Sequence, residues 1–219
     1  MNVLFLTATQ NEMNTLCSYE KEEKSFFPSR HDIRLFHNVT GVGACDVDHK
    51  LILPSCGGYP DVVISFGCVG SISTSILSGS FVFPTAVSFL DNQELYEINL
   101  PSNKPLFLPW IYEVTSCKPF FGKITTVHSF VFQQEHKTFL HRSLGALAVD
   151  MESFFIVKAC ANSSIPIVLI RLVVDDYSDN FCALEEYLSK ENSILSHSSY
   201  TLCTILDNVL SNLKIKPSK

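Results

Sequence analysis

Three acidic side chains of this sequence stand where apolar runs typical of buried strands come to an end. Glu12 follows "NVLFLTA", Glu152 follows "ALAVD", and Asp175 ends "IPIVLIRLVVD". A carboxyl group can take a proton from water or give one to a leaving group, and two carboxyls in different surroundings can be driven to opposite roles. If these side chains share one site, the chemistry that they indicate is general acid–base catalysis.

Each of these residues also has a purely structural interpretation. Thr9 and Glu12 have the spacing of a capping box, and Glu152 is an acid in the first turn of a predicted helix, where the helix dipole favours negative charge. Asp175 can cap the segment that follows it. Arg171 is harder to explain in this way, because a guanidinium inside "IVLIRLVV" needs acceptors or a carboxylate when it is buried.

The elements that must position these side chains alternate between strands and helices. Apolar runs predict strands, and Pro84 indicates an edge or a bulge in one of them. The strands are expected at 2–8, 33–41, 61–72, 79–89, 122–131, 146–150 and 165–179, and the helices at 9–23, after a glycine turn within 41–53, at 132–144, at 151–164 and around the apolar stripe 202–213. This order predicts a single-domain α/β fold over 1–219, three-layered (αβα), with a central mixed, mainly parallel twisted sheet. In such sheets, sites lie beyond the carboxyl ends of the strands.

Residues 91–118 are the least regular part of the sequence. They contain Pro101, Pro105, Pro109 and the single tryptophan, Trp110. We expect an irregular excursion over the surface there, in the position of a lid.

Composition excludes several kinds of partner. Hydrophobic residues make up 46% of the 219 residues and charged residues 17%, which is typical of a globular domain with a full core. The formal net charge of −6 argues against nucleic acid or an anionic membrane as a partner. No apolar run is long enough for a membrane-spanning helix, and the absence of a basic residue before Lys21 is unlike a signal peptide.

The eight cysteines are scattered, with no C-x-x-C and no Cys/His zinc spacing. Several stand inside apolar runs, where a free cysteine behaves as a small hydrophobe. We therefore expect a reduced, cytoplasmic protein without a structural metal site.

Five segments, in this order, resemble the signature segments of a known family: "TATQNEM", "TGVGACDV", "DVVISFGCVGSI", "AVDMESFFIVKAC" and "IPIVLIRLVVDDYSD". The family is the purine nucleoside phosphorylase/uridine phosphorylase superfamily. The closer match is to its nucleosidase branch, whose members cleave methylthioadenosine, adenosylhomocysteine or futalosine. The resemblance runs from residue 1 to about 215 and implies a nucleoside phosphorylase-like fold.

The resemblance also implies catalytic roles. Glu12 would be the base that activates water, Arg171 would help to hold that water and the acidic cluster, and Asp175 would protonate the leaving purine at N7. Asp175 would then have a pKa raised by burial, and its second oxygen would accept from a 6-amino group.

Substrate-binding roles follow from the same resemblance. Glu152 and the Met151 backbone would bind the ribose hydroxyls, Phe130 would stack on the purine, and Val131 would offer backbone groups to its edge. The loop Cys68, Val69 and Gly70 would line the ribose and water pocket. Asp150 is interpreted as first-turn charge only.

The sequence departs from the family pattern at two site positions. Cys68 stands in place of a serine hydroxyl and Val174 in place of a second serine. A nucleoside-binding module that has lost catalysis is therefore one alternative. A phosphorylase is another, although "TGVGACD" supplies no arginine for phosphate.

Within the branch, "TAT" before Glu12 resembles futalosine hydrolases. The expected substrate is 6-amino-6-deoxyfutalosine or futalosine of menaquinone biosynthesis, with methylthioadenosine/adenosylhomocysteine as the alternative. The resemblance further implies a homodimer that acts on a small purine nucleoside with no cofactor and no metal.

Overall fold

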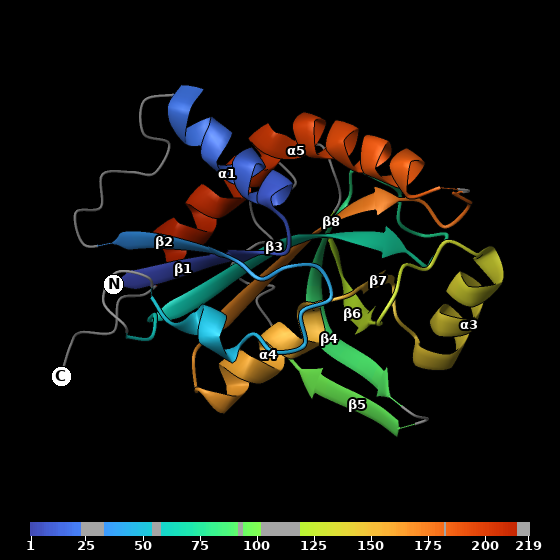
Figure 1. Cartoon of the computed structure of the whole chain (residues 1–219), viewed down its shortest axis with the longest axis horizontal. Coiled ribbons are helices and arrows are strands. Elements are labelled where there is room, and N and C mark those ends of the chain that lie inside the picture. The colour runs from blue at the N-terminus through green and yellow to red at the C-terminus, as the bar shows by residue number, and fades with distance from the viewer. Residues whose placement is uncertain (23–32, 54–57, 92–93, 102–118, 182, 214–219) are drawn as a thin grey trace.

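The computed structural model describes residues 1–22, 33–53, 58–91, 94–101, 119–181 and 183–213. These residues form one eight-stranded mixed sheet with helices packed against it (Figure 1). The fold class predicted from the sequence, a single α/β domain with a mixed, mainly parallel sheet, is confirmed.

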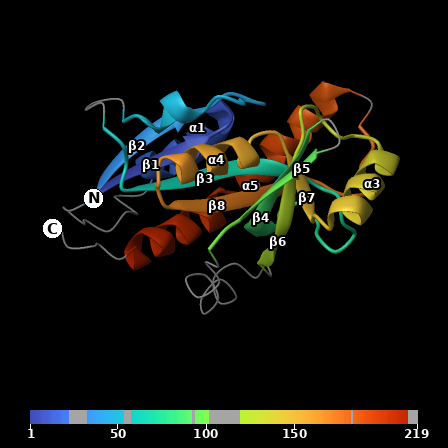
Figure 2. The same cartoon turned by 90° about the horizontal axis from the view of Figure 1, so that it is seen from below.

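The sheet consists of two parallel sets joined by antiparallel pairs. Its strands are β1 (Asn2–Thr7), β2 (Arg34–Val39), β3 (Val62–Ser71), β4 (Phe81–Asp91), β5 (Glu94–Asn99), β6 (Phe120–Thr126), β7 (Ala148–Asp150) and β8 (Ile167–Asp175). Strands β2, β1, β3 and β8 are parallel neighbours in that order, and β4, β6 and β7 form the second parallel set. The antiparallel pairs β4–β8 and β3–β7 join the two sets, which cross steeply in Figure 2.

Helices cover both faces of the first set. The helices are α1 (Gln10–Glu22), α3 (Gln134–Leu144), α4 (Ser153–Asn162) and α5 (Leu184–Asn212), with a short 3-10 helix η1 (Asp48–Leu51). Of these, α3 lies to the side and packs through Leu140 and Leu144 with Val149 of β7. Side chains alternate along a strand, so Val3 and Phe5 of β1 join the core cluster with α1 and α5, whereas Leu4 and Leu6 pack with α4 and η1. Figure 1 shows α1 and α5 above the sheet and α4 below it.

The predicted bulge at Pro84 is confirmed. The register of β4 against β6 shifts between Pro84 and Ala86. Proline has no N–H for the sheet, which is why the pairing is interrupted there.

Two expectations need correction. The helix expected within 41–53 is only η1, because Gly41 and Gly43 have φ of 91° and 68° and use the first part of the segment for a turn. The irregular stretch expected at 91–118 contains β5, since Glu94–Asn99 pairs residue by residue with the end of β4 as a hairpin. Residues 102–118 lie outside the described residues, and so does the lid expected there.

None of the helices in the described ranges is long and apolar enough to span a membrane. The cysteines whose side chains are described, Cys45, Cys68, Cys160 and Cys203, are free thiols.

Candidate active site

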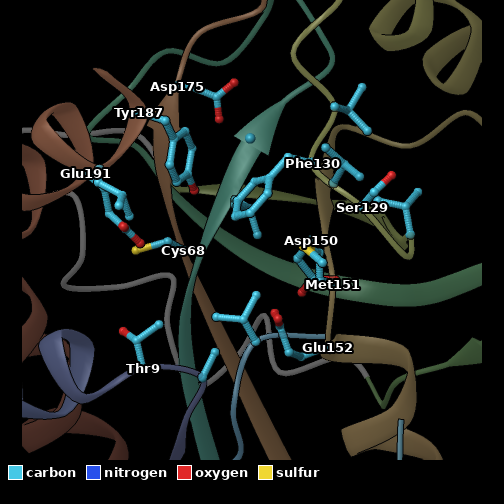
Figure 3. A pocket seen from close by; sticks show the side chains of 18 of the residues that line it. Thr9, Cys68, Ser129, Phe130, Asp150, Met151, Glu152, Asp175, Tyr187 and Glu191 are labelled. Carbon is cyan, nitrogen blue, oxygen red and sulfur yellow. The ribbon is translucent and has the colours of Figure 1, made fainter. Parts of the chain in front are cut away.

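One cavity opens where β1, β3, β6, β7 and β8 end, and it measures about 670 Å³ with its open mouth included. This size is within the range of small-molecule sites. Its described lining contains no lysine or arginine but five carboxyl side chains: Glu12, Asp150, Glu152, Asp175 and Glu191. Figure 3 shows Asp175 and Glu152 on opposite sides of this cavity.

Glu12 is both a helix cap and a wall of the cavity. It is 2% exposed, and its Oε2 accepts the N–H groups of Ala8 and Thr9 at 2.8 and 2.9 Å. The Thr9 hydroxyl in turn accepts the Glu12 N–H at 3.2 Å, which completes the capping box that the spacing predicts. Glu12 Oε1 accepts the Cys68 N–H from β3 at 2.8 Å. Three backbone donors therefore stabilise this carboxylate, and it faces the cavity without a bonded cation among the described residues.

Cys68 and Glu191 lie beside Glu12. The Cys68 sulfur, a Glu12 oxygen and a Glu191 oxygen all lie within 4.8 Å of one another, and Figure 3 shows the Glu191 carboxyl next to the sulfur. Burial, with the charges of Glu12 and Glu191, raises the pKa of the Cys68 thiol well above its usual value. Burial and the Glu12 charge raise the pKa of Glu191 to about 7. This trio is the one group of side chains in the described ranges with the composition to hold a metal ion.

Asp175 lies on the side of the cavity opposite Glu152 (Figure 3). Its Oδ2 accepts a hydrogen bond of 2.7 Å from the ammonium of Lys137, a residue of α3 that is 0% exposed. Burial raises the pKa of Asp175 to about 6 and Lys137 opposes that rise. Gly70 of β3 provides the room, because a Cβ there would lie 2.5 Å from Asp175 Oδ1.

Glu152 and Met151 form the wall that begins α4. Glu152 Oε1 accepts the Gly43 N–H at 2.7 Å, so the glycine turn predicted after β2 reaches the cavity. Burial and the charge of Asp150 raise the pKa of Glu152 to about 7. Met151 also lines the cavity. A carboxyl here, accepting hydroxyl groups of a ligand, would be favoured in its ionised form.

Arg171 bonds to Asp150 of the acidic cluster and, among the described contacts, makes no direct hydrogen bond to Glu12. Its Nε donates to Asp150 Oδ2 at 3.2 Å and to Ser153 Oγ at 2.9 Å, and its Nη1 and Nη2 donate to Ser65 at 3.1–3.2 Å. It is absent from the cavity lining. Arg171 pairs in register with Gly67 of β3, and a Cβ at Gly67 would lie 3.5 Å from the Arg171 guanidinium and 3.6 Å from Glu12 Oε1, so Arg171 and Glu12 lie on the same side of Gly67.

Asp150 is more than first-turn charge. It is buried, and its carboxylate accepts a hydrogen bond of 2.8 Å from the Thr126 hydroxyl. It also accepts hydrogen bonds from the N–H and the hydroxyl of Ser153 and from Nε of Arg171. Because Thr126 Oγ1 also accepts the Phe154 N–H at 2.9 Å, this network fixes the start of α4 against β6. Arg171 and Asp150 therefore hold Met151 and Glu152 in place.

An aromatic wall completes the cavity. Phe130 is 40% exposed and lies against Phe132 and Tyr187, with ring centroids 5.5 and 5.2 Å apart. Val131 is part of the same wall, and Cys68, Val69 and Gly70 line the cavity from β3. Of the residues expected from the sequence, only Arg171 is outside the lining.

Sequence reasoning missed Lys137, Tyr187 and Glu191. All three come from helices, and a signal existed for the two charged residues. Extended toward its start, the buried stripe of α5 passes through Tyr187, Glu191 and Leu195, and that of α3 through Lys137, Leu140 and Leu144. A charged residue at an apolar position of a helix faces a core or a site.

The arrangement suits acid–base work on a small ligand. One end holds a carboxylate stabilised by N–H groups, the other a carboxyl that is protonated in part near neutral pH, and an aromatic face lies between acidic walls. A flat, largely neutral ligand with hydroxyl groups fits such a lining better than an anion does.

Comparison with known proteins gives a consistent result. A model of the phosphorylase superfamily matches residues 2–207. A 5'-methylthioadenosine/S-adenosylhomocysteine nucleosidase of Buchnera aphidicola subsp. Acyrthosiphon pisum (strain APS) is 24% identical over 218 residues, covering 93% of this chain and 88% of that protein.

Solved structures share the fold. The 5'-methylthioadenosine/S-adenosylhomocysteine nucleosidase of Helicobacter pylori, with butyl-thio-DADMe-Immucillin-A, has a TM-score of 0.76 at 17% identity over 97% of this chain and 99% of that one. The futalosine hydrolase of Helicobacter pylori strain 26695 has a TM-score of 0.76 at 16% identity over 97% and 98%.

Proposed function

The chain belongs to the phosphorylase superfamily, and we propose that within it the protein is a purine nucleoside N-ribohydrolase, which cleaves the N-glycosidic bond with water. The observation that carries hydrolysis, instead of transfer to phosphate, is the charge of the cavity. Glu12, which accepts three backbone N–H groups, faces the cavity, and no lysine or arginine of the described residues lines it. Such a lining repels an inorganic phosphate anion but admits water.

The proposed reaction uses the two ends of the cavity. Glu12 takes a proton from water while the water oxygen bonds to C1′ of the sugar. The C1′–N9 bond breaks with its electron pair going to the base, and Asp175 gives its proton to N7, so the base leaves neutral. Exchange with solvent then returns a proton to Asp175 and removes one from Glu12. General acid–base assistance contributes roughly 10²- to 10⁴-fold per group.

Side chains between the two ends would bind the rest of the nucleoside. The Glu152 carboxyl accepts the ribose hydroxyls above Met151, and Phe130 stacks on the purine. Arg171 has a supporting place in this proposal, since it acts through Asp150 on the start of α4.

The structure changes the contact that the sequence predicts between Asp175 and a 6-amino group of the purine. Lys137 already donates to Asp175 Oδ2, so the proton of a neutral Asp175 belongs on Oδ1, which then donates to N7. One oxygen is thus less free to accept from the base than expected. Both 6-amino and 6-oxo purines must therefore be tested.

Two substrates have specific support. The first of the five matching segments, "TATQNEM", favours 6-amino-6-deoxyfutalosine or futalosine of menaquinone biosynthesis. The names of the curated relatives favour methylthioadenosine and adenosylhomocysteine.

The deciding experiment incubates the purified protein with these four nucleosides, with and without phosphate, and separates the products by chromatography. The proposal expects free purine base and free sugar without phosphate. Strict phosphate dependence would contradict it in favour of a phosphorylase. Binding of adenine without cleavage of any nucleoside would indicate a binding module that has lost catalysis.

The proposal includes a homodimer. Val42 and Leu188, which line the cavity, are 51% and 40% exposed, and apolar side chains at the mouth of a site are suited to a partner surface. Sedimentation velocity at micromolar concentration tests this part separately.

A further inference from the structure

Glu191 has no part in the reaction as described so far, yet it lies at the reacting end. It follows Tyr187 by one turn on α5, is 7% exposed, and lines the cavity. One of its oxygens lies within 4.8 Å of both a Glu12 oxygen and the Cys68 sulfur. A second buried carboxyl so close to the candidate base must affect where protons are held.

Hydrogen bonding decides which of the two carboxyls is protonated. Glu12 accepts three backbone N–H groups, which stabilise its ionised form. Glu191 accepts no backbone N–H from the described residues; the Cys68 thiol is its bonded neighbour. Two buried carboxyls at this separation do not both ionise readily, so the shared proton goes to the one with fewer donors.

We propose that Glu191 is a further catalytic residue, which as a neutral acid donates a hydrogen bond to the attacking water while Glu12 accepts that water's proton. The inference rests on the proposed function. It explains how the site works without the hydroxyl that the family pattern has at position 68, since a thiol is a weak donor and a carboxylic acid is a strong one. Glu191 keeps its proton throughout, so the overall reaction is unchanged.

The titratable groups facing Glu191 are Glu12 from α1 and Cys68 from β3, with Tyr187 on the same helix, and none is a cation. The charge of Glu12 favours protonation of Glu191, whereas the hydrogen bond with the Cys68 thiol opposes it and has the smaller effect. In the described chain, Glu191 has no ion pair to oppose the effect of Glu12. Its raised pKa, about 7, agrees with the geometry.

A metal ion is the rival occupant of the same trio. It would have to displace the protons of both Glu191 and Cys68, while Glu12 already holds three N–H donors. The proton-sharing arrangement requires neither change.

The first test compares Glu191→Met and Glu191→Gln, with Glu185→Gln, an exposed acid of α5, as the matched control. Methionine keeps the volume without a donor, whereas glutamine keeps an N–H donor. We expect kcat to fall about 100-fold for E191M and about threefold for E191Q, with KM nearly constant and E185Q like the unmodified protein. An E191M protein that folds with undiminished kcat would overturn the proposal.

The pH dependence of kcat/KM is a second measurement, and it would not change if Glu191 had only a structural role. Asp175 and Glu191 must both be protonated, so log kcat/KM should fall with a slope near −2 above pH 7 in the unmodified protein and near −1 in E191Q. Identical slopes would count against the proposal.

The second test does not need turnover. Carbon-13 NMR of labelled glutamate carboxyls, assigned with E191Q and E12Q, should show Glu191 titrating near pH 7, and lower in E12Q. Titration of Glu191 in the usual glutamate range would overturn the inference, as would activity that is lost with EDTA and restored by Zn²⁺. If the unmodified protein cleaves no nucleoside, the proposed function has failed; if it does and E191M is unaffected, only this inference has.

Discussion

The two ends of the cavity each hold a buried carboxyl, but by different means. Glu12 is fixed by three backbone N–H groups, whereas Asp175 is held between the effect of burial, which raises its pKa to about 6, and the Lys137 ammonium, which opposes it. Backbone N–H groups carry no titratable proton, so the hydrogen bonds that they donate to Glu12 do not depend on pH. A balance of two opposed effects leaves the carboxyl near its midpoint at neutral pH, as a proton donor requires. The same functional group is thus made a base at one end and an acid at the other.

Removing the base should have the largest effect. Glu12→Gln retains an oxygen for the Ala8 and Thr9 N–H groups, and glutamine is an accepted capping-box residue, so the helix cap is preserved while the bond from the Cys68 N–H is lost. We expect kcat to fall by about 10³-fold with only a small decrease in Tm, measured by base release and thermal unfolding. If turnover survives at the original rate, water activation lies elsewhere.

Asp175→Asn should have a smaller effect, because the amide N–H can still donate to N7. We expect kcat to fall by about 10²-fold at pH 6. In the unmodified protein, activity should fall as pH rises through about 6, where Asp175 loses its proton. In the variant this decline should be reduced, and an unchanged decline would exclude Asp175 as the acid.

Lys137→Met sharpens the comparison by removing the opposing effect. The pKa of Asp175 should then rise further, because burial acts without the neighbouring ammonium. We expect the ratio of kcat/KM at pH 8 to that at pH 6 to increase by about tenfold, even if stability is lower. Lys190→Met is the comparison variant: Lys190 pairs with Asp176 and Asp179 of the same loop, and its charge lowers the pKa of Asp175 less than Lys137 does, so a smaller shift is expected. An equal shift in both variants would mean that loop order, not charge, is responsible.

Gly70→Ala tests the space around Asp175 with a single methyl group. The added Cβ would lie 2.5 Å from Asp175 Oδ1, so the carboxyl must move. We expect a loss of kcat of about tenfold. Gly67→Ala is the comparison on the same strand, because its Cβ would contact Arg171 and Glu12 at 3.5–3.6 Å, which requires neither side chain to move. Comparable kcat values for the two variants would contradict a requirement for room at residue 70.

The sequence predicts one class of site residue well. Glu12, Glu152 and Asp175 follow buried strands, and the ends of neighbouring strands converge whatever the loops between them do. Lys137 and Glu191 come from helices, and which turn of a helix meets the cavity depends on how the helix docks, which short-range spacing does not specify.

The same distinction applies to the fold. Long apolar runs such as β3 and β8 predict strands reliably because they are buried on both faces. The helix prediction for segment 41–53 was wrong because Gly41 and Gly43 adopt positive φ, which a helix excludes, in a segment of otherwise helical composition. Strand β5 was missed because most of its side chains are exposed, and its pairing partner, not its own pattern, determines its structure.

The capping box of α1 links folding of the chain to formation of the site. Because the bonds that nucleate this helix also orient the Glu12 carboxylate, the first turn cannot form without placing that group. The reorganisation that a solvent-exposed acid would undergo at each turnover is then completed once, during folding. Fraying of the first turn of α1 should accordingly abolish catalysis under conditions in which the rest of the domain is still folded.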